Sequence, residues 1–174
     1  MTVEPTLGCT ARGIDPPCER CAAGEFGACE NFGADGLGDA GLPPGTSIGY
    51  NRRTGGSFGE YFVAHETQLV SVPETVSDEL AVLTDPMACS LHAIGRADWQ
   101  AARRVLVYGA GVLGLGVVAS LRALGWAGQL DVTGAPGRLA DRARSLGASE
   151  VLRLPPGAER HRVVAERTGA TIHR

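Results

Sequence analysis

The sequence contains no lysine, and all 16 of its basic side chains are arginines. Without a lysine amine, the chain cannot form a Schiff base with pyridoxal phosphate or with a carbonyl substrate. It also cannot supply the phosphate-binding lysine of a Walker A loop. Aromatic residues are scarce as well, at 5%. These absences exclude two classes of enzyme and predict a core with few large aromatic side chains.

Long uninterrupted apolar runs are also missing. The most apolar stretch, residues 105–121, is broken by glycines and flanked by arginines, and it is short for a helix that crosses a bilayer. The sequence shows no positively charged start followed by an apolar stretch and a cleavage site, so it predicts no signal peptide. We therefore expect a cytoplasmic protein without a membrane partner.

Glycine is abundant, with 25 copies, and 44% of the residues are hydrophobic. This composition is typical of a globular protein with many tight turns. The formal net charge is −3, yet residues 135–174 hold eight arginines against four acids. These arginines alternate with acids and apolar residues, which favours solvated helix faces over a phosphate-binding tail.

The pattern of the chain changes along its length. Residues 1–50 are irregular and need a tether other than a packed core. Two strands are predicted next, at 60–64 and 68–72, then a short helix capped by Ser77 and a helix starting at Asp85-Pro86. Strands at 105–108, 130–133 and 151–152 then alternate with helices at 112–124, 139–146 and 159–167. Such alternation predicts an α/β fold with a parallel sheet.

A glycine motif lies at the first turn of this α/β part. Gly109, Gly111 and Gly114 form the pattern G-x-G-x-x-G directly after a predicted strand, and Val112 and Leu113 open the following helix. The first glycine permits the tight turn, the second lets the backbone approach a pyrophosphate, and the third lets the helix pack on the strand. The helix N-terminus offers free N–H groups to phosphates. The context predicts a dinucleotide site, the alternative being a turn that binds nothing.

The residues about 20 positions further on bear on the choice of dinucleotide. Thr133 and Gly134 stand there, at the end of the second strand, where an acid would hold the adenosine ribose hydroxyls. Neither is an acid, and Asp131 lies earlier, within the strand. Arg138 follows closely and suits a 2′-phosphate, so the pattern favours NADP over NAD. The alternative for Arg138 is a solvated residue at a helix start.

Four of the five cysteines, Cys9, Cys18, Cys21 and Cys29, fall in the irregular first segment. Thiolates in this number and spacing suit tetrahedral zinc, which would also tether the segment. Disulfides are the alternative, but the odd cysteine count and the expected compartment argue against them. A redox C-x-x-C is disfavoured because Cys18 follows two prolines in a loop. Cys89 stands apart and is expected to be a small buried residue.

The cysteine loop and the downstream glycine motif together resemble the zinc-dependent medium-chain alcohol dehydrogenase superfamily. The family's structural-zinc loop follows a strand that often ends in Glu-Pro, as Glu4-Pro5 precedes Cys9 here. Cys18-x-x-Cys21-x7-Cys29 matches its last three ligands. The gap between Cys9 and Cys18 is eight residues instead of two. Asp15 occupies the usual position of the first ligand and is the alternative to Cys9.

The resemblance extends to two further segments. Gly55 to Tyr61 is similar to the family's G-G-x-x-E-Y stretch, and Thr84 to Ala93 is similar to a segment whose leading Cys, Glu or Asp can ligate the catalytic zinc. The resemblance implies that Asp85 is that ligand. The alternative is an ordinary helix N-cap before proline. His65 and His92 are expected to be packed or surface residues.

The resemblance implies a partial GroES-like catalytic domain at 1–84, followed by the first half of a Rossmann doubly wound sheet at 85–174. The family's catalytic zinc polarises an alcohol oxygen while hydride passes to the nicotinamide. We expect a fragment of a zinc-dependent, NAD(P)-linked alcohol or polyol dehydrogenase, inactive or weakly active alone and homo-oligomeric when complete. A non-catalytic zinc- and nucleotide-binding module is the alternative. A zinc-ribbon nucleic-acid binder is a third, and we expect no nucleic-acid partner.

Overall fold

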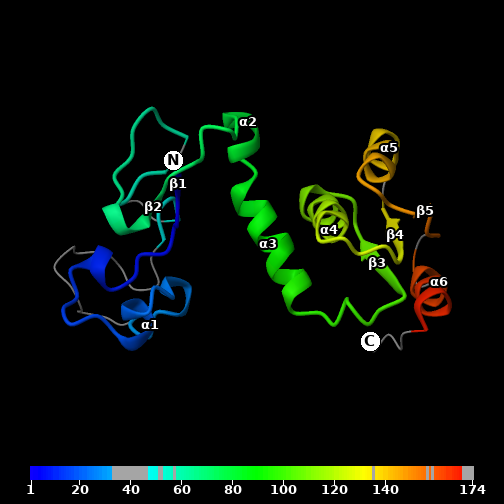
Figure 1. Cartoon of the computed structure of the whole chain (residues 1–174), viewed down its shortest axis with the longest axis horizontal. Coiled ribbons are helices and arrows are strands. Elements are labelled where there is room, and N and C mark those ends of the chain that lie inside the picture. Colours follow the sequence, from blue (N-terminus) through cyan, green and yellow to red (C-terminus); the bar gives the residue numbers. More distant parts are fainter. Residues whose placement is uncertain are drawn as a thin grey trace. The chain divides into compact units, whose positions relative to one another are not determined.

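The chain divides into two compact units, residues 1–81 and 82–174, in the computed structural model (Figure 1). The structure describes residues 1–32, 47–50, 53–56, 58–134, 136–155, 157 and 159–169. Within the described residues, no helix is both long and apolar enough to cross a membrane.

The first unit consists of short elements joined by loops. Strand β1 (Thr2–Val3) pairs antiparallel with β2 (Leu69–Val70). The remaining elements are the single turns η1 (Thr10–Arg12), η2 (Phe26–Ala28) and η3 (Glu66–Gln68) and the helices α1 (Glu19–Ala22) and α2 (Asp78–Ala81). Such short pieces bury little apolar surface, so this unit depends on specific polar and sulfur contacts.

The two strands predicted before residue 73 are largely absent. Residues 60–64 form no strand, and the second prediction is reduced to β2. Tyr61 and Val63 are exposed, at 91% and 84%. No described segment pairs with residues 60–64, and a strand without a neighbour has no ladder of hydrogen bonds to stabilise it. The apolar pattern alone was therefore misleading here.

Gln68 joins the start of the first unit to its end. Its side chain is 2% exposed, and its Nε2 donates to the carbonyl oxygens of Glu4 at 2.9 Å and Thr6 at 3.2 Å. Its Oε1 accepts from the backbone N–H of His65 at 3.2 Å. A buried amide whose donor and acceptor atoms are both hydrogen-bonded fixes the backbone around it. Gln68 therefore positions the segment that leads into Cys9.

The second unit contains a three-stranded parallel sheet. Strands β3 (Arg104–Tyr108), β4 (Gln129–Thr133) and β5 (Glu150–Leu152) lie in that order. Helices α3 (Thr84–Gly95), α4 (Val112–Ala123), α5 (Arg138–Ser145) and α6 (Glu159–Thr168) accompany them. Figure 1 shows α4 and α6 on opposite sides of β3. The strand–helix alternation predicted for residues 105–167 is confirmed to within a residue or two at each boundary.

The core of this unit lies between the sheet and its helices. Parallel strands covered by helices are apolar on both faces, as the sequence of β3 and β4 is. The buried members of the core are Ile94, Val107, Ala110, Val118, Leu121, Trp126, Leu130, Val132 and Ala143. The core thus contains one buried aromatic side chain, as the low aromatic content predicts.

Arg122 joins the segment before β4 to the segment before β5. Its Nε donates to the carbonyl oxygen of Gly147 at 2.9 Å, and its Nη1 donates to those of Trp126 at 2.6 Å and Gly128 at 3.1 Å. The guanidinium also lies over the Trp126 ring, 5.6 Å from its centroid. A planar group with five donors can bond several carbonyls at once, which a lysine amine does less well.

Within the described residues, three arginines of the C-terminal region are paired with acids. Arg144 contacts Asp141 at 3.1 Å, and Arg167 contacts Glu150 at 3.2 Å. Arg162 contacts both Glu159 at 3.0 Å and Glu166 at 2.6 Å. These pairs are solvent-exposed and contribute little stability individually. They agree with the interpretation of this region as solvated surface.

Helix α3 packs closely against α4 through small residues. Ser90 is 1% exposed, and its hydroxyl lies 2.8 Å from the Pro86 carbonyl oxygen and 3.0 Å from that of Leu113. A Cβ on Gly116 would lie 2.5 Å from the Ser90 Oγ. Glycine at this position therefore allows the two helices to approach.

A second close contact joins α4 to the end of β3. A Cβ on Gly114 would collide with the carbonyl oxygen of Gly109 and would lie 3.2 Å from Cγ1 of Val107. The Gly109 carbonyl belongs to the backbone of the turn, so it cannot move aside as a flexible side chain can. Gly114 therefore performs the packing role that the motif predicts.

We expect Gly114→Ala to lower the free energy of unfolding of the second unit by about 1–3 kcal/mol, since the added methyl group overpacks the turn. Urea unfolding followed by tryptophan fluorescence measures this loss. Both tryptophans, Trp99 and Trp126, lie in the second unit, so the signal reports on that unit. The matched control is Gly95→Ala in α3, where a Cβ meets no atom within 4 Å. It should be neutral or stabilising by up to about 1 kcal/mol, and equal behaviour of the two variants would contradict the packing role.

Candidate metal and dinucleotide sites

The four cysteines of the first unit meet in one cluster. The Sγ atoms of Cys9, Cys18, Cys21 and Cys29 all lie within 4.8 Å of one another, and those of Cys9 and Cys29 are 3.7 Å apart. All four are free thiols, and Cys18 alone among them is not buried. A tetrahedral zinc with Zn–S bonds of about 2.3 Å separates its sulfurs by about 3.8 Å. The spacing and the soft donor set therefore fit zinc.

Backbone N–H groups point at the sulfurs from short local turns. The N–H of Cys21 donates to the sulfur of Cys18 at 3.5 Å, because Cys18 is the N-cap of α1. The N–H of Cys18 donates to Cys9 at 3.5 Å, and that of Cys9 donates to Cys21 at 3.4 Å. Such bonds favour the thiolate over the thiol. The loop is thus built to hold negative sulfur.

The thiol pKa values differ across the cluster. The hydrogen bond from the Cys21 N–H, more than any other contact, lowers the pKa of Cys18 to about 6. Burial raises the pKa of Cys21 to about 12 and also raises that of Cys29. Buried thiolates close together repel one another unless a cation lies between them. A divalent metal would supply that charge and replace the protons.

Two residues next to the cluster were not found by sequence reasoning. Nδ2 of Asn31 donates to the Cys9 sulfur at 3.3 Å, and Nη1 of Arg12 donates to the Asn31 carbonyl oxygen at 2.7 Å. Arg12 is 3% exposed. A zinc ion with four thiolates carries a net charge of about −2, which a nearby guanidinium offsets. The available signal in the sequence was position, because Arg12 lies between two of the cysteines and Asn31 lies two residues after Cys29.

Asp15, the alternative first ligand, is exposed and lies outside the cluster. The geometry thus favours Cys9 over Asp15 as the ligand that completes the set with Cys18, Cys21 and Cys29. That any of these residues binds zinc stays a prediction.

Asp85 lies in the first turn of α3 and is exposed. Leu83 is the N-cap residue of α3, so the interpretation of Asp85 as the cap is wrong. Among the described residues, the four cysteines are the one group of three or more metal-ligating side chains within reach of a common ion. The residues described around Asp85 therefore do not make up a second metal site, and its role as a catalytic zinc ligand stays a prediction.

The remaining cysteine and histidines take ordinary positions. Cys89 is exposed, so the expectation of a buried residue is wrong; α3 carries it on a face that described residues do not cover. His65 caps η3, where its Nδ1 accepts from the N–H of Thr67 at 3.2 Å. His92 is exposed in the last turn of α3.

The glycine motif forms the turn between β3 and α4. Gly109 has φ +107°, a conformation that side chains disfavour, and its N–H donates to the carbonyl oxygen of Thr133 at 3.2 Å. Gly111 is the N-cap of α4, and a Cβ there would meet no atom within 4 Å. Open space therefore lies beside the peptide groups at the start of α4, where Val112 and Leu113 are exposed. This cradle fits a pyrophosphate.

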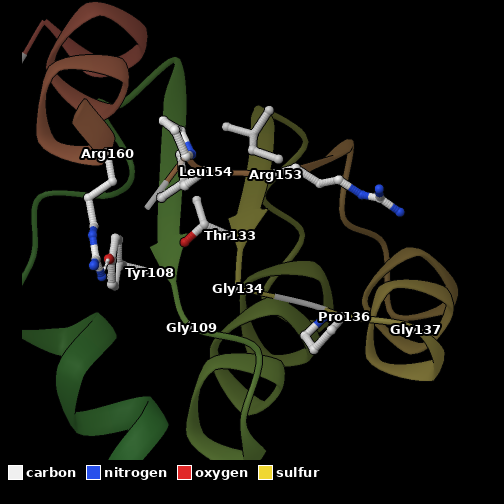
Figure 2. A pocket seen from close by; sticks show the side chains of 11 residues that line it. Tyr108, Gly109, Thr133, Gly134, Pro136, Gly137, Arg153, Leu154 and Arg160 are labelled. Atoms are coloured by element: carbon white, nitrogen blue, oxygen red, sulfur yellow. Dashed lines mark hydrogen bonds between the residues drawn. The ribbon is translucent and has the colours of Figure 1, made fainter. Parts of the chain in front are cut away.

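A cavity of about 550 Å³ opens beside this turn, at the carboxyl ends of the three parallel strands (Figure 2). Ligands of open α/β sheets bind at this edge. Residues that line the cavity include Tyr108, Gly109, Thr133, Gly134, Arg153 and Arg160. Its size is that of a small-molecule site.

The structure brings Gly109, Thr133 and Gly134 together at the cavity, as their spacing predicted. Gly111 and Gly114 form the adjacent turn and helix start without lining the cavity. Arg138 is exposed in the first turn of α5 and does not line it either. Thr133 is 1% exposed, and its hydroxyl has no hydrogen-bond partner among the described residues.

Arg153 and Arg160 were not singled out from the sequence. Arg153 directly follows β5, and Arg160 is the second residue of α6. Arg160 reaches the cavity because α6 packs back against β3. The one available signal was the position of Arg153 just beyond a predicted strand, where ligand-binding residues of parallel sheets occur.

No protein-family model matches the sequence. The chain is 30% identical over 133 residues to a probable (R)-acetoin-forming diacetyl reductase of Saccharomyces cerevisiae, covering 72% of this chain and 28% of that protein. It is 30% identical over 137 residues to an L-threonine 3-dehydrogenase of Pectobacterium carotovorum, covering 79% and 35%. The chain thus spans about a third of the length of these relatives.

Solved structures share the fold. An acetophenone reductase of Geotrichum candidum in complex with NAD matches with a TM-score of 0.59 at 26% identity, over 85% of this chain and 40% of that one. A putative zinc-binding dehydrogenase of Sinorhizobium meliloti bound to NADP matches with a TM-score of 0.59 at 24% identity, over 87% and 38%. These similarities support the α/β fold, and both matches cover most of this chain.

We expect the reduced chain to bind about one zinc ion, held by the four cysteines. Cys9→Ser should lower the zinc content well below one per chain, because it removes a soft ligand. Asp15→Asn should leave the zinc content unchanged. Atomic emission of protein purified under reducing conditions measures both. Zinc retained in Cys9→Ser but lost in Asp15→Asn would reverse the ligand assignment.

Asn31→Ala should weaken zinc retention about tenfold, since outer-shell hydrogen bonds to ligands are worth about that much or more. Competition with a chromophoric chelator gives the affinity. Glu30→Gln is the control, because it changes a neighbouring exposed side chain and leaves the N–H···S bonds intact. Equal affinity of the two variants would mean that the Asn31 amide does not support the site.

Proposed function

The chain belongs to the zinc-dependent medium-chain alcohol dehydrogenase superfamily, and we propose that it is part of an NAD(P)-linked oxidoreductase that interconverts an alcohol or polyol and its carbonyl compound. The observation that carries this proposal is the presence, in one chain, of a four-cysteine cluster and a glycine turn beside a cavity at parallel strand ends. The relatives that support it are a probable diacetyl reductase and an L-threonine 3-dehydrogenase.

In this proposal the dinucleotide lies across the turn at Gly109 and Gly111. The N–H groups at the start of α4 hold its pyrophosphate, because the first turn of a helix has no internal partners for them. Thr133 and Gly134 lie at the end of β4, on the side of the adenosine ribose. The bound nicotinamide supplies the hydride chemistry, while these residues position the cofactor.

The proposed zinc at the four cysteines has a structural role. Four cysteines would fill all four positions of a tetrahedral zinc, which leaves no open position for a substrate. The cysteines and the few apolar residues around them, Ile14 and Phe26, form the small core of this segment. Metal binding would therefore contribute directly to the folding of the first unit.

We further propose that Asp85 contributes to a second, catalytic zinc site together with residues outside positions 1–174. A zinc there would polarise the alcohol oxygen. Since the described residues offer one carboxylate at that place, no catalytic step is assigned to this chain alone. The same proposal includes an alcohol or polyol substrate and a boundary between the two domains at residues 84 and 85. It also includes self-association of the complete protein and a cytoplasmic location.

The 174-residue chain should bind a reduced dinucleotide without steady oxidation of any alcohol. Enhancement or quenching of NAD(P)H fluorescence measures binding, and absorbance at the nicotinamide band measures turnover. Gly111→Val is the matched variant. Its side chain would enter open space rather than the protein, so the second unit should fold as before. The same side chain would block the approach of the pyrophosphate and weaken binding about tenfold or more.

Two outcomes would count against the proposal. Failure of the unmodified chain to bind any dinucleotide would remove the cofactor role. Unchanged binding by Gly111→Val would show that the glycine turn is not the site. Turnover by the 174-residue chain would instead overturn the expectation that residues outside it complete the catalytic site.

A further inference from the structure

The cavity at the strand ends has a positive lining. Arg153 and Arg160 both line it, and no aspartate or glutamate does. Figure 2 shows the two arginines on opposite sides of Thr133 and Gly134, with Arg160 beside Tyr108. Two guanidinium groups without a carboxylate make this edge of the sheet attractive to an anion.

Neither guanidinium group is paired with an acid among the described residues. Within the described part of the chain, neither Arg153 nor Arg160 has a carboxylate oxygen within 4.0 Å, in contrast to Arg144, Arg162 and Arg167. Arg160 contacts neutral acceptors, the Gly157 carbonyl oxygen at 2.9 Å and the Tyr108 hydroxyl at 3.5 Å. These contacts orient the Arg160 side chain without neutralising it.

The end of β4 is neutral. In dinucleotide folds a carboxylate at this place binds the adenosine 2′-hydroxyl and repels a 2′-phosphate. Here Thr133 and Gly134 occupy it, and a Cβ on Gly134 would lie 3.6 Å from Cα of Gly109 in the glycine turn. The acid of this strand, Asp131, is 1% exposed and is held by Gln129 at 2.7 Å and Arg104 at 3.6 Å. It therefore does not offer a carboxylate to the cavity.

We propose that this cavity selects NADP(H) over NAD(H), with Arg153 and Arg160 supplying the charge that holds the 2′-phosphate. The inference rests on the proposed dinucleotide function and assigns its specificity. A 2′-phosphate carries a charge of nearly −2 and accepts several hydrogen bonds, which a guanidinium fork donates well. The assignment moves the determinant from Arg138, which the sequence suggested, to two arginines that the fold brings to the cavity.

Four probes test the inference on the 174-residue chain: NADP⁺, NAD⁺, adenosine 2′,5′-bisphosphate and AMP. NADP⁺ should bind about ten- to a hundredfold more tightly than NAD⁺, as charge-assisted hydrogen bonds to one phosphate allow. The bisphosphate should exceed AMP by a similar ratio, which isolates the adenosine end. Raising the ionic strength should reduce both ratios, since the arginines are near the surface.

Variants locate the determinant. Arg153→Gln and Arg160→Gln should each reduce the NADP⁺/NAD⁺ ratio about tenfold and leave NAD⁺ affinity nearly unchanged. Arg138→Gln should keep the ratio, as should Arg162→Gln, whose guanidinium is already paired with Glu159 and Glu166. Circular dichroism checks that each variant is folded. Arg153 is exposed and makes no described ion pair, so its replacement should not affect folding.

The outcomes separate the inference from the proposed function. Equal affinity for NADP⁺ and NAD⁺ overturns the inference and leaves the dinucleotide function standing. A ratio that falls in Arg138→Gln but not in Arg153→Gln or Arg160→Gln also overturns it. If neither dinucleotide binds, the proposed function fails, and the inference fails with it.

Discussion

The second unit depends on one close contact, between α4 and the carbonyl oxygen of Gly109. A side chain at Gly114 would occupy the space of that oxygen, so the helix can start at the end of β3 only because Gly114 has none. This start brings the N–H groups of α4 to the carboxyl edge of the sheet. The same turn bonds to Thr133 through the Gly109 N–H, which sets the end of β4 beside it. The cavity is a consequence of this packing.

The first unit solves a different physical problem. Its described elements are too short to enclose an apolar core, and its buried cluster consists of cysteines with few apolar neighbours. Sulfur–sulfur proximity is unfavourable once the thiols ionise, so the cluster needs a cation to be stable in that form. The buried Arg12, which holds the Asn31 carbonyl, adds positive charge on the outer side. Order here depends on charge balance, whereas order in the second unit depends on close packing.

These two kinds of order explain what the sequence could predict. The strands at 104–108 and 129–133 were predictable because apolar periodicity and glycine turns are local signals. The cysteine cluster was predictable because ligand chemistry restricts spacing. By contrast, residues 60–64 have a strand-like pattern but no described partner, and pairing is not a local property. Arg160 reaches the cavity through the packing of α6 on β3, which a pattern of residues within one helix does not encode.

Because the chain has no lysine, arginine makes all of its contacts from long basic side chains. At three places a guanidinium forms hydrogen bonds that a single ammonium forms less well, because its donors form a planar fork. Arg122 bonds the carbonyls of Trp126, Gly128 and Gly147 together, and the buried Arg12 bonds the carbonyl of Asn31. Arg160 is oriented by two neutral acceptors and still keeps donors for a ligand. Carbonyl oxygens and phosphate oxygens accept the same fork of donors, so the guanidinium that bonds the Gly157 carbonyl from Arg160 is also suited to a phosphate.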